Sequence, residues 1–550
     1  MAGPSLSLST STSPYRQFQR RPRQFADGDD DRYALDDENG AKIFETDTGD
    51  LLYTIIERND TATLNRYLEK FPLILTPRLP YDEDAFYIAA RDGRTDVLRV
   101  LLEYYAAHPT QTEGPNARGY LLLNVACRYA QIGTARFLLD NQPALGEIHA
   151  RSEGGGTALL MAATSLACAE NDRHDSILEY VARGEQLMQL LLDKGADARD
   201  VLPCAWASPK DGQPCKTVLG LAICRASPKL VKRLINQGAD VHAKQSLSIM
   251  HGPLGQLDRV WDVTPLHVSS FYLNTEGIQV LFDHRDNSID IADMVLCHDT
   301  NGRIPLHLAA GSEEHILPQD DIISHAISTT ELLLASNPST VNSQDNQGQT
   351  ALHCAVSTYT RMRGKYLDVL KILCANGADA SLREKNGKTP LHYIGFIVLA
   401  SKPDSTAVID LLLAHGTSID DTDIDGNTPL HLIARNLQGV ELARALLRRG
   451  ASISTQNSKG NTPLHEAADG FIYLTGKILT PEYQISTQND MIRVLQEVAG
   501  NTNLMDQLNI ASKTPRQIRD ETRNKWLEEE KSRNQRLTGK GRGRGKGKAC

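Results

Sequence analysis

The chain has 550 residues, with 68 acidic and 59 basic side chains and a formal charge of −9 at pH 7. Its nine cysteines are an odd number and form no CxxC pair, so the sequence indicates neither a disulfide framework nor a zinc site. No apolar run approaches the length of a membrane span and no secretory signal is visible. We therefore expect an intracellular protein, either cytoplasmic or nuclear.

Residues 1–47 differ from the rest in composition. They begin with a Ser/Thr-rich stretch, continue through four arginines between 16 and 23, and reach an aspartate block at 27–31. Low hydrophobicity and separated charge blocks predict disorder. The lack of acids in the first 26 residues is also typical of an organelle transit peptide, although Pro14 and Pro22 interrupt any amphipathic helix.

Residues 48–262 contain a series of short apolar stretches, each followed by a leucine-rich segment with helical spacing. The stretches are DLLYTII from Asp50, DAFYIAA from Asp84, YLLLNVA from Tyr120, TALLMAA from Thr157 and TVLGLAI from Thr217. We interpret them as degenerate copies of a unit that becomes regular further along the chain.

The regular units fill residues 263–510 and open on TPLH or a close variant. The first residues of these tetrapeptides lie at 264, 304, 350, 389, 428 and 462, in steps of 40, 46, 39, 39 and 34 residues. The threonine can cap a helix and the proline suits its first turn. A catalytic histidine has no reason to be copied along a chain, so the repetition predicts a structural role for His267, His307, His353, His392, His431 and His465.

Each regular unit also has a second half. In 367–380 the leucine-rich stretch LDVLKILCANGADA has helical spacing, and Gly377 is placed to end the helix. A polar turn such as 384–387 then leads to the next TPLH. Two helices and a turn, repeated with this period, predict a repeat array.

These motifs resemble the ankyrin repeat, whose pattern is TPLHxAA, a leucine-rich second helix and GAD before the turn. GAD stands at 195–197, 238–240 and 377–379. The resemblance implies an all-α solenoid of about eleven helix-turn-helix repeats with short hairpin-like turns and disordered termini, over roughly residues 48–528. It also implies that the TPLH histidines hydrogen-bond within and between neighbouring units.

The repeat steps exceed the ankyrin unit and therefore require insertions, which map to loops in such arrays. The stretch SLSIMHGPLGQLDRVWDV at 246–263 carries apolar Met250, Leu254 and Trp261. Trp261 could pack on the adjacent repeat, because tryptophan is usually largely buried. Alternatively, the three residues form an insertion finger that binds a partner.

The C-terminal region divides into a helix and a tail. Residues 511–530 are mostly polar, which suits a capping helix at the end of a solenoid. Residues 531–550 hold eight Lys or Arg and no acid, whereas residues 1–530 hold 51 basic and 68 acidic residues. This disordered basic, Gly-rich tail could bind RNA or DNA, direct nuclear import, solubilise the chain or fold onto its acidic body. Its central charges are Lys540, Arg542, Arg544, Lys546 and Lys548.

No catalytic signature appears in the sequence, and nothing requires a cofactor or a metal. We therefore expect a non-enzymatic, monomeric scaffold or adaptor that binds other proteins on the concave face and turn tips, with nucleic-acid recruitment through the tail as the alternative. An acidic body favours a basic partner. The expected contact residues at the turn tips are Asp299, Asn301, Asp345, Asn346, Glu384, Lys385, Asp423, Asp425, Asn457 and Lys459. Reversing the charges of Asp345, Glu384 and Asp423 is expected to weaken binding without unfolding.

Overall fold

The structure is a computed structural model that describes most of the chain. The described residues are 34–36, 42–44, 50–70, 84–109, 114–116, 119–167, 177–203, 216–251, 256–284, 290–312, 319–361, 366–396, 406–472, 479–499 and 503–541. They are mostly helical. The chain forms two compact units, Met1–Ala243 and Lys244–Cys550, which are considered separately below.

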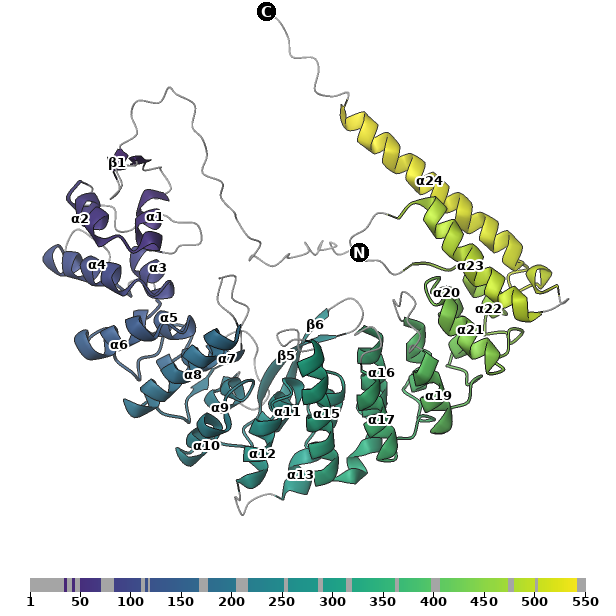
Figure 1. The fold of residues 1–550 in the computed structure, drawn as a ribbon, viewed down its shortest axis with the longest axis horizontal. Helices are drawn as coiled ribbons and strands as arrows, with labels where there is room; N and C mark the ends of the chain where they lie inside the picture. The colour runs from purple at the N-terminus through teal and green to yellow at the C-terminus, as the bar shows by residue number, and fades with distance from the viewer. Residues whose placement is uncertain are drawn as a thin grey trace, which may run out of the picture. The chain divides into compact units, whose positions relative to one another are not determined.

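The first unit consists of successive pairs of helices with two small strand pairs. Its elements are β1 (Ala34–Asp36), β2 (Lys42–Phe44), α1 (Asp50–Arg58), α2 (Thr61–Lys70), α3 (Ala85–Arg91), α4 (Thr95–Ala107), α5 (Leu122–Arg128), α6 (Ile132–Asn141), α7 (Ala158–Ala167), α8 (Ile177–Asp193), β3 (Val201–Leu202), β4 (Lys216–Thr217), α9 (Val218–Ala222) and α10 (Pro228–Asn236). The first helices of the pairs, α1, α3, α5, α7 and α9, contact one another in succession, and α2, α4, α6 and α8 form a second row (Figure 1).

The second unit repeats this plan with longer insertions. Its elements are β5 (Gln245–His251), β6 (Gln256–Val263), α11 (Pro265–Phe271), α12 (Thr275–Asp283), α13 (Ile291–Val295), α14 (Pro305–Ala310), α15 (Gln319–Ser336), η2 (Pro338–Asn342), α16 (Ala351–Arg361), α17 (Leu367–Ala375), α18 (Pro390–Tyr393), η3 (Ile394–Phe396), α19 (Ala407–Ala414), α20 (Pro429–Arg435), α21 (Val440–Arg448), α22 (Pro463–Ala468), α23 (Pro481–Ala499), η5 (Leu504–Asp506) and α24 (Pro515–Gly541). The TPLH helices α11, α14, α16, α18, α20 and α22 lie side by side in that order (Figure 1).

The first helices are apolar on nearly every side. In α20, Pro429, Leu430, His431, Ile433 and Ala434 are all buried. A helix that is apolar all round must be covered by neighbours on both sides. Stacking between the preceding and following first helices provides this cover, so the hydrophobic core runs along each unit rather than forming a single centre.

The mostly helical content agrees with the expected all-α repeat fold, but short strands accompany the helices. The described part contains three antiparallel strand pairs, β1–β2, β3–β4 and β5–β6. The insertion predicted at 246–263 folds as the hairpin β5–β6, which begins one residue earlier, at Gln245. Its alternation of apolar and polar residues suits a strand with one covered face, and Leu247 and the opposite Val260 are both buried.

The predicted disordered termini also need correction where the structure describes them. Within residues 1–47, strands β1 and β2 pair Ala34 with Phe44. At the other end, α24 continues to Gly541, whereas the predicted capping helix ended at residue 530. The added residues 531–538 are mostly strong helix formers, and they follow three consecutive glutamates whose charges can pair with basic residues one turn later. The helix therefore ends at Gly541, within the glycine-rich stretch that begins at residue 539.

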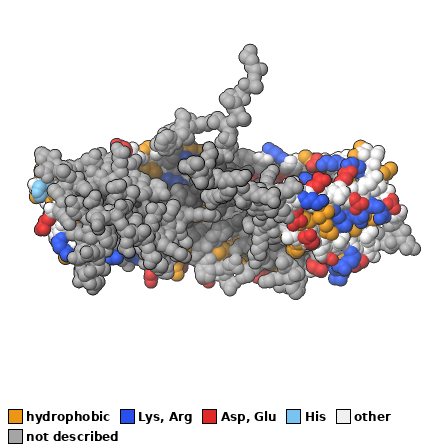
Figure 2. All heavy atoms as spheres, turned by 90° about the horizontal axis from the view of Figure 1, so that it is seen from above, with side chains coloured by type: hydrophobic (Ala, Val, Ile, Leu, Met, Phe, Trp, Pro, Cys, Tyr) orange, Lys and Arg blue, Asp and Glu red, His pale blue; other side chains and the backbone are white. Residues whose placement is uncertain are grey.

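Helix α24 packs on α22 and α23. Figure 2 shows described side chains at the right of its view. Basic and acidic side chains are interspersed there and form no patch of a single charge. Trp526 is 9% exposed and is the main apolar anchor of this helix. A polar helix held by one buried aromatic residue is what the end of a repeat array requires. No helix in the described part of the chain is both long and apolar enough to cross a membrane.

Candidate functional site

The turns of the second unit share one five-residue plan. They occupy 299–303, 345–349, 384–388, 423–427, 457–461 and 509–513. In each, the first N–H donates to the fifth carbonyl, as in Asp423 to Asn427 at 3.0 Å. The fourth residue has a positive φ, which glycine adopts most easily. It is glycine in every turn except the last, where Ser512 has φ 57°.

The side chain of the first residue closes each turn from inside. Asp423 Oδ1 accepts from the N–H groups of Asp425 at 3.0 Å and Asn427 at 2.8 Å, and its Oδ2 accepts from Asn427 Nδ2 at 3.2 Å. Asp299, Asp345 and Asn457 accept in the same way from the third and fifth N–H groups. These side chains are structural acceptors that hold the loop shut.

The structure divides the predicted partner contacts into buried and exposed residues. Asp299, Glu384, Asp423 and Asn457 are buried and Asp345 is half-buried, so the predicted contacts at the first position of each turn face inward. Sequence alone placed them outside because polar turn residues are usually exposed. The remaining predicted contacts are exposed: Asn301, Asn346, Lys385, Asp425 and Lys459. The charge reversal at Asp345, Glu384 and Asp423 would therefore disrupt the turns themselves.

The first-position side chain of each turn acts as a clamp. Removing one clamp should destabilise the second unit, whereas a matched substitution of an exposed turn residue should have little effect. Asp423→Ala loses three hydrogen bonds to a buried carboxylate, and we expect a loss of about 1–3 kcal/mol in the free energy of unfolding. Asp425→Ala, two residues away and exposed, should change it by less than about 0.5 kcal/mol. Urea denaturation of both variants provides the comparison; equal effects would contradict the clamp.

Successive turns are joined by a backbone ladder. The second N–H of each turn donates to the third carbonyl of the turn before it: Asn346 to Asn301 at 2.8 Å, Lys385 to Gln347 at 2.8 Å, Ile424 to Asn386 at 2.9 Å, Ser458 to Asp425 at 2.8 Å and Ile510 to Lys459 at 3.1 Å. The row of turns is therefore fixed in register, whatever side chains stand at the second and third positions.

Glycine at the fourth position also makes room for this ladder. A Cβ on Gly460 would lie 2.8 Å from the backbone nitrogen of Ile510, and φ there is +69°. Gly460→Ala should therefore destabilise the unit by about 1–3 kcal/mol. In contrast, Ser512→Gly removes a left-handed non-glycine residue and should stabilise it by about 0.5–1 kcal/mol. Thermal unfolding of the two variants should shift in opposite directions, and shifts of the same sign would contradict this account.

In three of the six turns, the residue just before the turn provides a further hydrogen-bonding brace that sequence reasoning missed. Gln344 Nε2 donates to Gly348 O at 2.8 Å and to Arg383 O at 3.1 Å. Arg383 Nη1 donates to the carbonyl of Gly387 in its own turn at 3.1 Å and to Thr422 O in the next unit. In the same way, Gln456 Nε2 donates to Gly460 O in its own turn and to Leu508 O. A long donor side chain recurring just before the turn acid was the available signal.

The TPLH histidines connect each helix to the following turn. In α18, Thr389 N–H donates to His392 Nδ1 at 3.1 Å, and His392 Nε2 lies 3.1 Å from Asn427 O. The corresponding Nε2 contacts are His267 to Arg303 O, His307 to Gln349 O, His353 to Lys388 O, His431 to Asn461 O and His465 to Lys513 O, all at 3.0–3.2 Å. Since a carbonyl can only accept, Nε2 carries the proton and Nδ1 is free to accept.

Burial sets the charge of these six imidazoles. Each is 1% exposed or less. Removal from water lowers the pKa of His267 and of His353 to about 4, and it also lowers the pKa of the other four. The neutral form that the hydrogen bonds require is therefore the form that the environment favours.

The comparison with known families agrees with this geometry. Residues 322–394 and 396–497 match the model of ankyrin repeats (3 copies). This part of the chain belongs to the ankyrin repeat family. The match covers the repeats from α15 to α23, where the TPLH pattern is densest. No curated protein matches the chain in sequence.

The units before residue 244 lack the TPLH histidine and use other residues between neighbouring repeats. Asp84 caps α3 through Tyr87 N–H at 2.8 Å and accepts from Tyr120 Oη, 36 residues later, at 2.5–2.6 Å. Asn124 Nδ2 donates to Gly156 O at 2.7 Å, and the hydroxyl of Thr157 donates to Asp200 at 2.8 Å. Each junction has its own polar pair, so no single motif could reveal them in the sequence.

The predicted insertion finger is only partly within the described residues. Met250 lies in β5, where it pairs with Leu257, and Leu254 lies outside the described residues. Trp261 is half-buried in β6, and its backbone continues the ladder: Thr300 N–H donates to Trp261 O at 3.1 Å. The hairpin thus takes the place of a preceding turn for the repeat that begins at α14, and partner binding by the finger remains a prediction.

Within the part of the chain that the structure describes, no group of three or more His, Cys, Asp or Glu is arranged to hold a metal ion. Burial raises the pKa of Cys354 to about 12 and that of Cys374 to about 11, so neither thiol is an ionised nucleophile at neutral pH.

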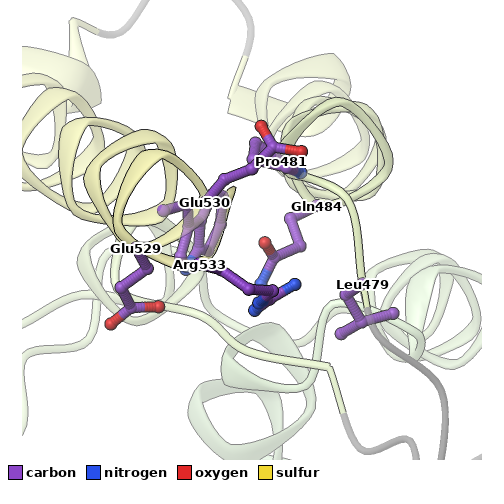
Figure 3. A pocket seen from close by; sticks show the side chains of 7 residues that line it. Leu479, Pro481, Gln484, Glu529, Glu530 and Arg533 are labelled. Atoms are coloured by element: carbon purple, nitrogen blue, oxygen red, sulfur yellow. The ribbon is translucent and has the colours of Figure 1, made fainter. Parts of the chain in front are cut away.

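A hollow of about 320 Å³ lies between the start of α23 and α24. Figure 3 shows Gln484 and Arg533 pointing into it while Glu529 points away. Its lining provides no nucleophile with an adjacent base: Leu479, Pro481, Gln484, Trp526, Glu529, Glu530 and Arg533. Of the predicted tail charges, Lys540 falls in α24, and the other four lie outside the described residues.

Proposed function

We propose that this ankyrin repeat protein is a non-enzymatic scaffold or adaptor, whose repeats form a solenoid of about eleven units that holds partner proteins on its concave face and turn tips. Ankyrin repeats in general are protein-protein interaction modules. The observation that carries the proposal is the laddered row of turns. Clamps, braces and histidines fix its backbone, whereas exposed second and third positions such as Lys385, Asp425 and Lys459 can vary at little cost to the core.

The proposal is tested by affinity purification of the full chain from cells, followed by identification of the bound proteins. Two further samples separate the array from the tail: one treated with nuclease, and one in which all eight Lys and Arg from residue 531 onward are replaced by Gln. Substitution is preferred to truncation because α24 continues to Gly541. Partners retained in every sample support an array-based scaffold; partners lost with the basic residues or the nuclease would refute it.

The second candidate function is recruitment to RNA or chromatin through the tail. The observation in its favour is the run of eight basic residues without an acid from residue 531, at the end of an otherwise acidic chain. Phosphate neutralisation would make such binding sequence-independent and steeply salt-dependent. Binding of the chain to duplex DNA and single-stranded RNA at rising salt tests this; no loss of affinity between 50 and about 200 mM salt would exclude it.

A further inference from the structure

The exposed side chains of the turns differ between the two ends of the row. In the first two turns the second residues take part in the ladder: Thr300 Oγ1 accepts from Trp261 N–H at 3.1 Å, and Asn346 Nδ2 donates to Thr300 O at 3.0 Å. In the later turns Lys385, Ile424 and Ile510 stand at this position, and none has a side-chain hydrogen bond or ion pair to a described residue. The later tips are therefore available to another molecule.

Three large apolar side chains lie exposed on these later tips. Ile424 is 67% exposed, Leu508 is 57% exposed and Ile510 is 74% exposed. Leu508 stands in the position before the turn, where Gln344 and Gln456 carry braces. Single exposed apolar residues are normal on a protein surface, but three at the fourth and sixth turns of one row indicate an interaction surface.

On the same turn tips, exposed cations outnumber exposed anions. Lys385 and Lys459 are exposed cations, and Asp425 is the exposed anion between them. The other acids of these turns, Glu384 and Asp423, are 5% and 7% exposed. The turns thus bury most of their negative side chains and expose positive ones, contrary to the basic partner that the overall composition favours.

The backbone beneath these side chains is rigid. A Cβ on Gly387 would lie 3.0 Å from Ile424 N, and the ladder bond from Ile510 N–H to Lys459 O is 3.1 Å. Most N–H groups of these turns already have partners within the turn or in the preceding turn, so a binding molecule is recognised mainly through side chains. Side chains held on a fixed backbone lose less conformational entropy on binding.

We propose that Lys385, Ile424, Asp425, Lys459, Leu508 and Ile510 form a tip strip that docks a partner segment carrying apolar side chains and more carboxylates than cations. The apolar tips bury the partner's apolar side chains, and the two lysines pair with its carboxylates. The inference rests on the proposed function, because it names the partner chemistry for the same row of turns.

The test uses the full chain as bait in a display selection of random peptides. An apolar variant combines Ile424→Ser, Leu508→Gln and Ile510→Ser. Each replacement stands at the same turn position elsewhere in the row, at Ser458 or Gln456, so the fold should tolerate it. A charge variant combines Lys385→Glu and Lys459→Glu. The matched controls are Leu178→Ser, which replaces a residue 70% exposed in the first unit, and Lys232→Glu on the exposed surface of α10.

We expect selected peptides rich in Leu, Ile or Phe together with Asp or Glu. Measured by fluorescence anisotropy, their Kd should rise at least about tenfold on each strip variant and stay unchanged on the controls, with circular dichroism verifying the fold. Peptides that are basic, or that bind the strip variants as tightly as the native chain, would overturn the strip while leaving a protein-binding array. No peptide bound above background would count against both the strip and the proposed function.

Discussion

Replacing His392 with alanine should lower the free energy of unfolding of the second unit by about 2–4 kcal/mol. The side chain is fully buried, accepts from Thr389 N–H at 3.1 Å and reaches Asn427 O in the next turn at 3.1 Å. Alanine leaves a buried donor and a buried acceptor unpaired and opens a cavity between two repeats. Urea denaturation followed by circular dichroism measures the loss.

The chain provides two comparisons for this variant. His298 is exposed, so His298→Ala should change the unfolding free energy by less than about 0.5 kcal/mol. His392→Gln should cost less than His392→Ala, because α24 already uses glutamine at this position: Thr514 N–H donates to Gln517 Oε1 at 2.9 Å. If alanine and glutamine at 392 were equally destabilising, the hydrogen bonds would not be the source of the effect.

Lowering the pH from 7 to 5 should destabilise the second unit strongly. The folded pKa of His267 and His353 lies near 4, below the ordinary value of 6.5 expected in the unfolded chain. Above pH 6.5 both states are neutral and no penalty arises. As the pH falls from 6.5 towards 4, the unfolded chain binds protons that the folded chain does not, so stability decreases by about 1.4 kcal/mol per pH unit for each histidine.

At pH 5 each of these two histidines should contribute a loss of about 2 kcal/mol relative to pH 8, and the four others, whose pKa is also lowered, add to it. Urea midpoints measured at pH 8, 7, 6 and 5 provide the slope. His353→Gln removes one titrating group and keeps an acceptor for the cap. The unfolding free energy of this variant should therefore depend less steeply on pH, because unfolding takes up one proton fewer. A midpoint that does not change between pH 8 and 5 would contradict neutral buried histidines.

The sequence by itself determined the repeated elements, because their signals are local. A threonine cap, a proline in the first turn and an apolar run predict each short helix, and Thr428 to Ala434 form part of one as α20. The spacing of six TPLH-type motifs predicted a repeat array, and the resemblance of these motifs to the ankyrin pattern is confirmed by the family match at 322–394 and 396–497. A residue whose role is set within four positions can be read without its neighbours in space.

Only the tertiary structure decided which polar turn residues point inward. Asp423 and Asp425 are two residues apart and chemically identical, yet Asp423 clamps the loop and Asp425 is exposed. The hydrogen bonds of Asp423 lie within its own turn, whereas its burial, at 7% exposed, depends on the neighbouring turn, whose Gly387 lies against its backbone. The same holds for the hairpin β5–β6, whose Trp261 joins the ladder through Thr300 39 residues later, and for Tyr120, whose hydroxyl reaches Asp84 in the preceding repeat. Unlike the TPLH histidine contacts, these contacts between repeats recur in no motif, so they emerge only when the units are stacked.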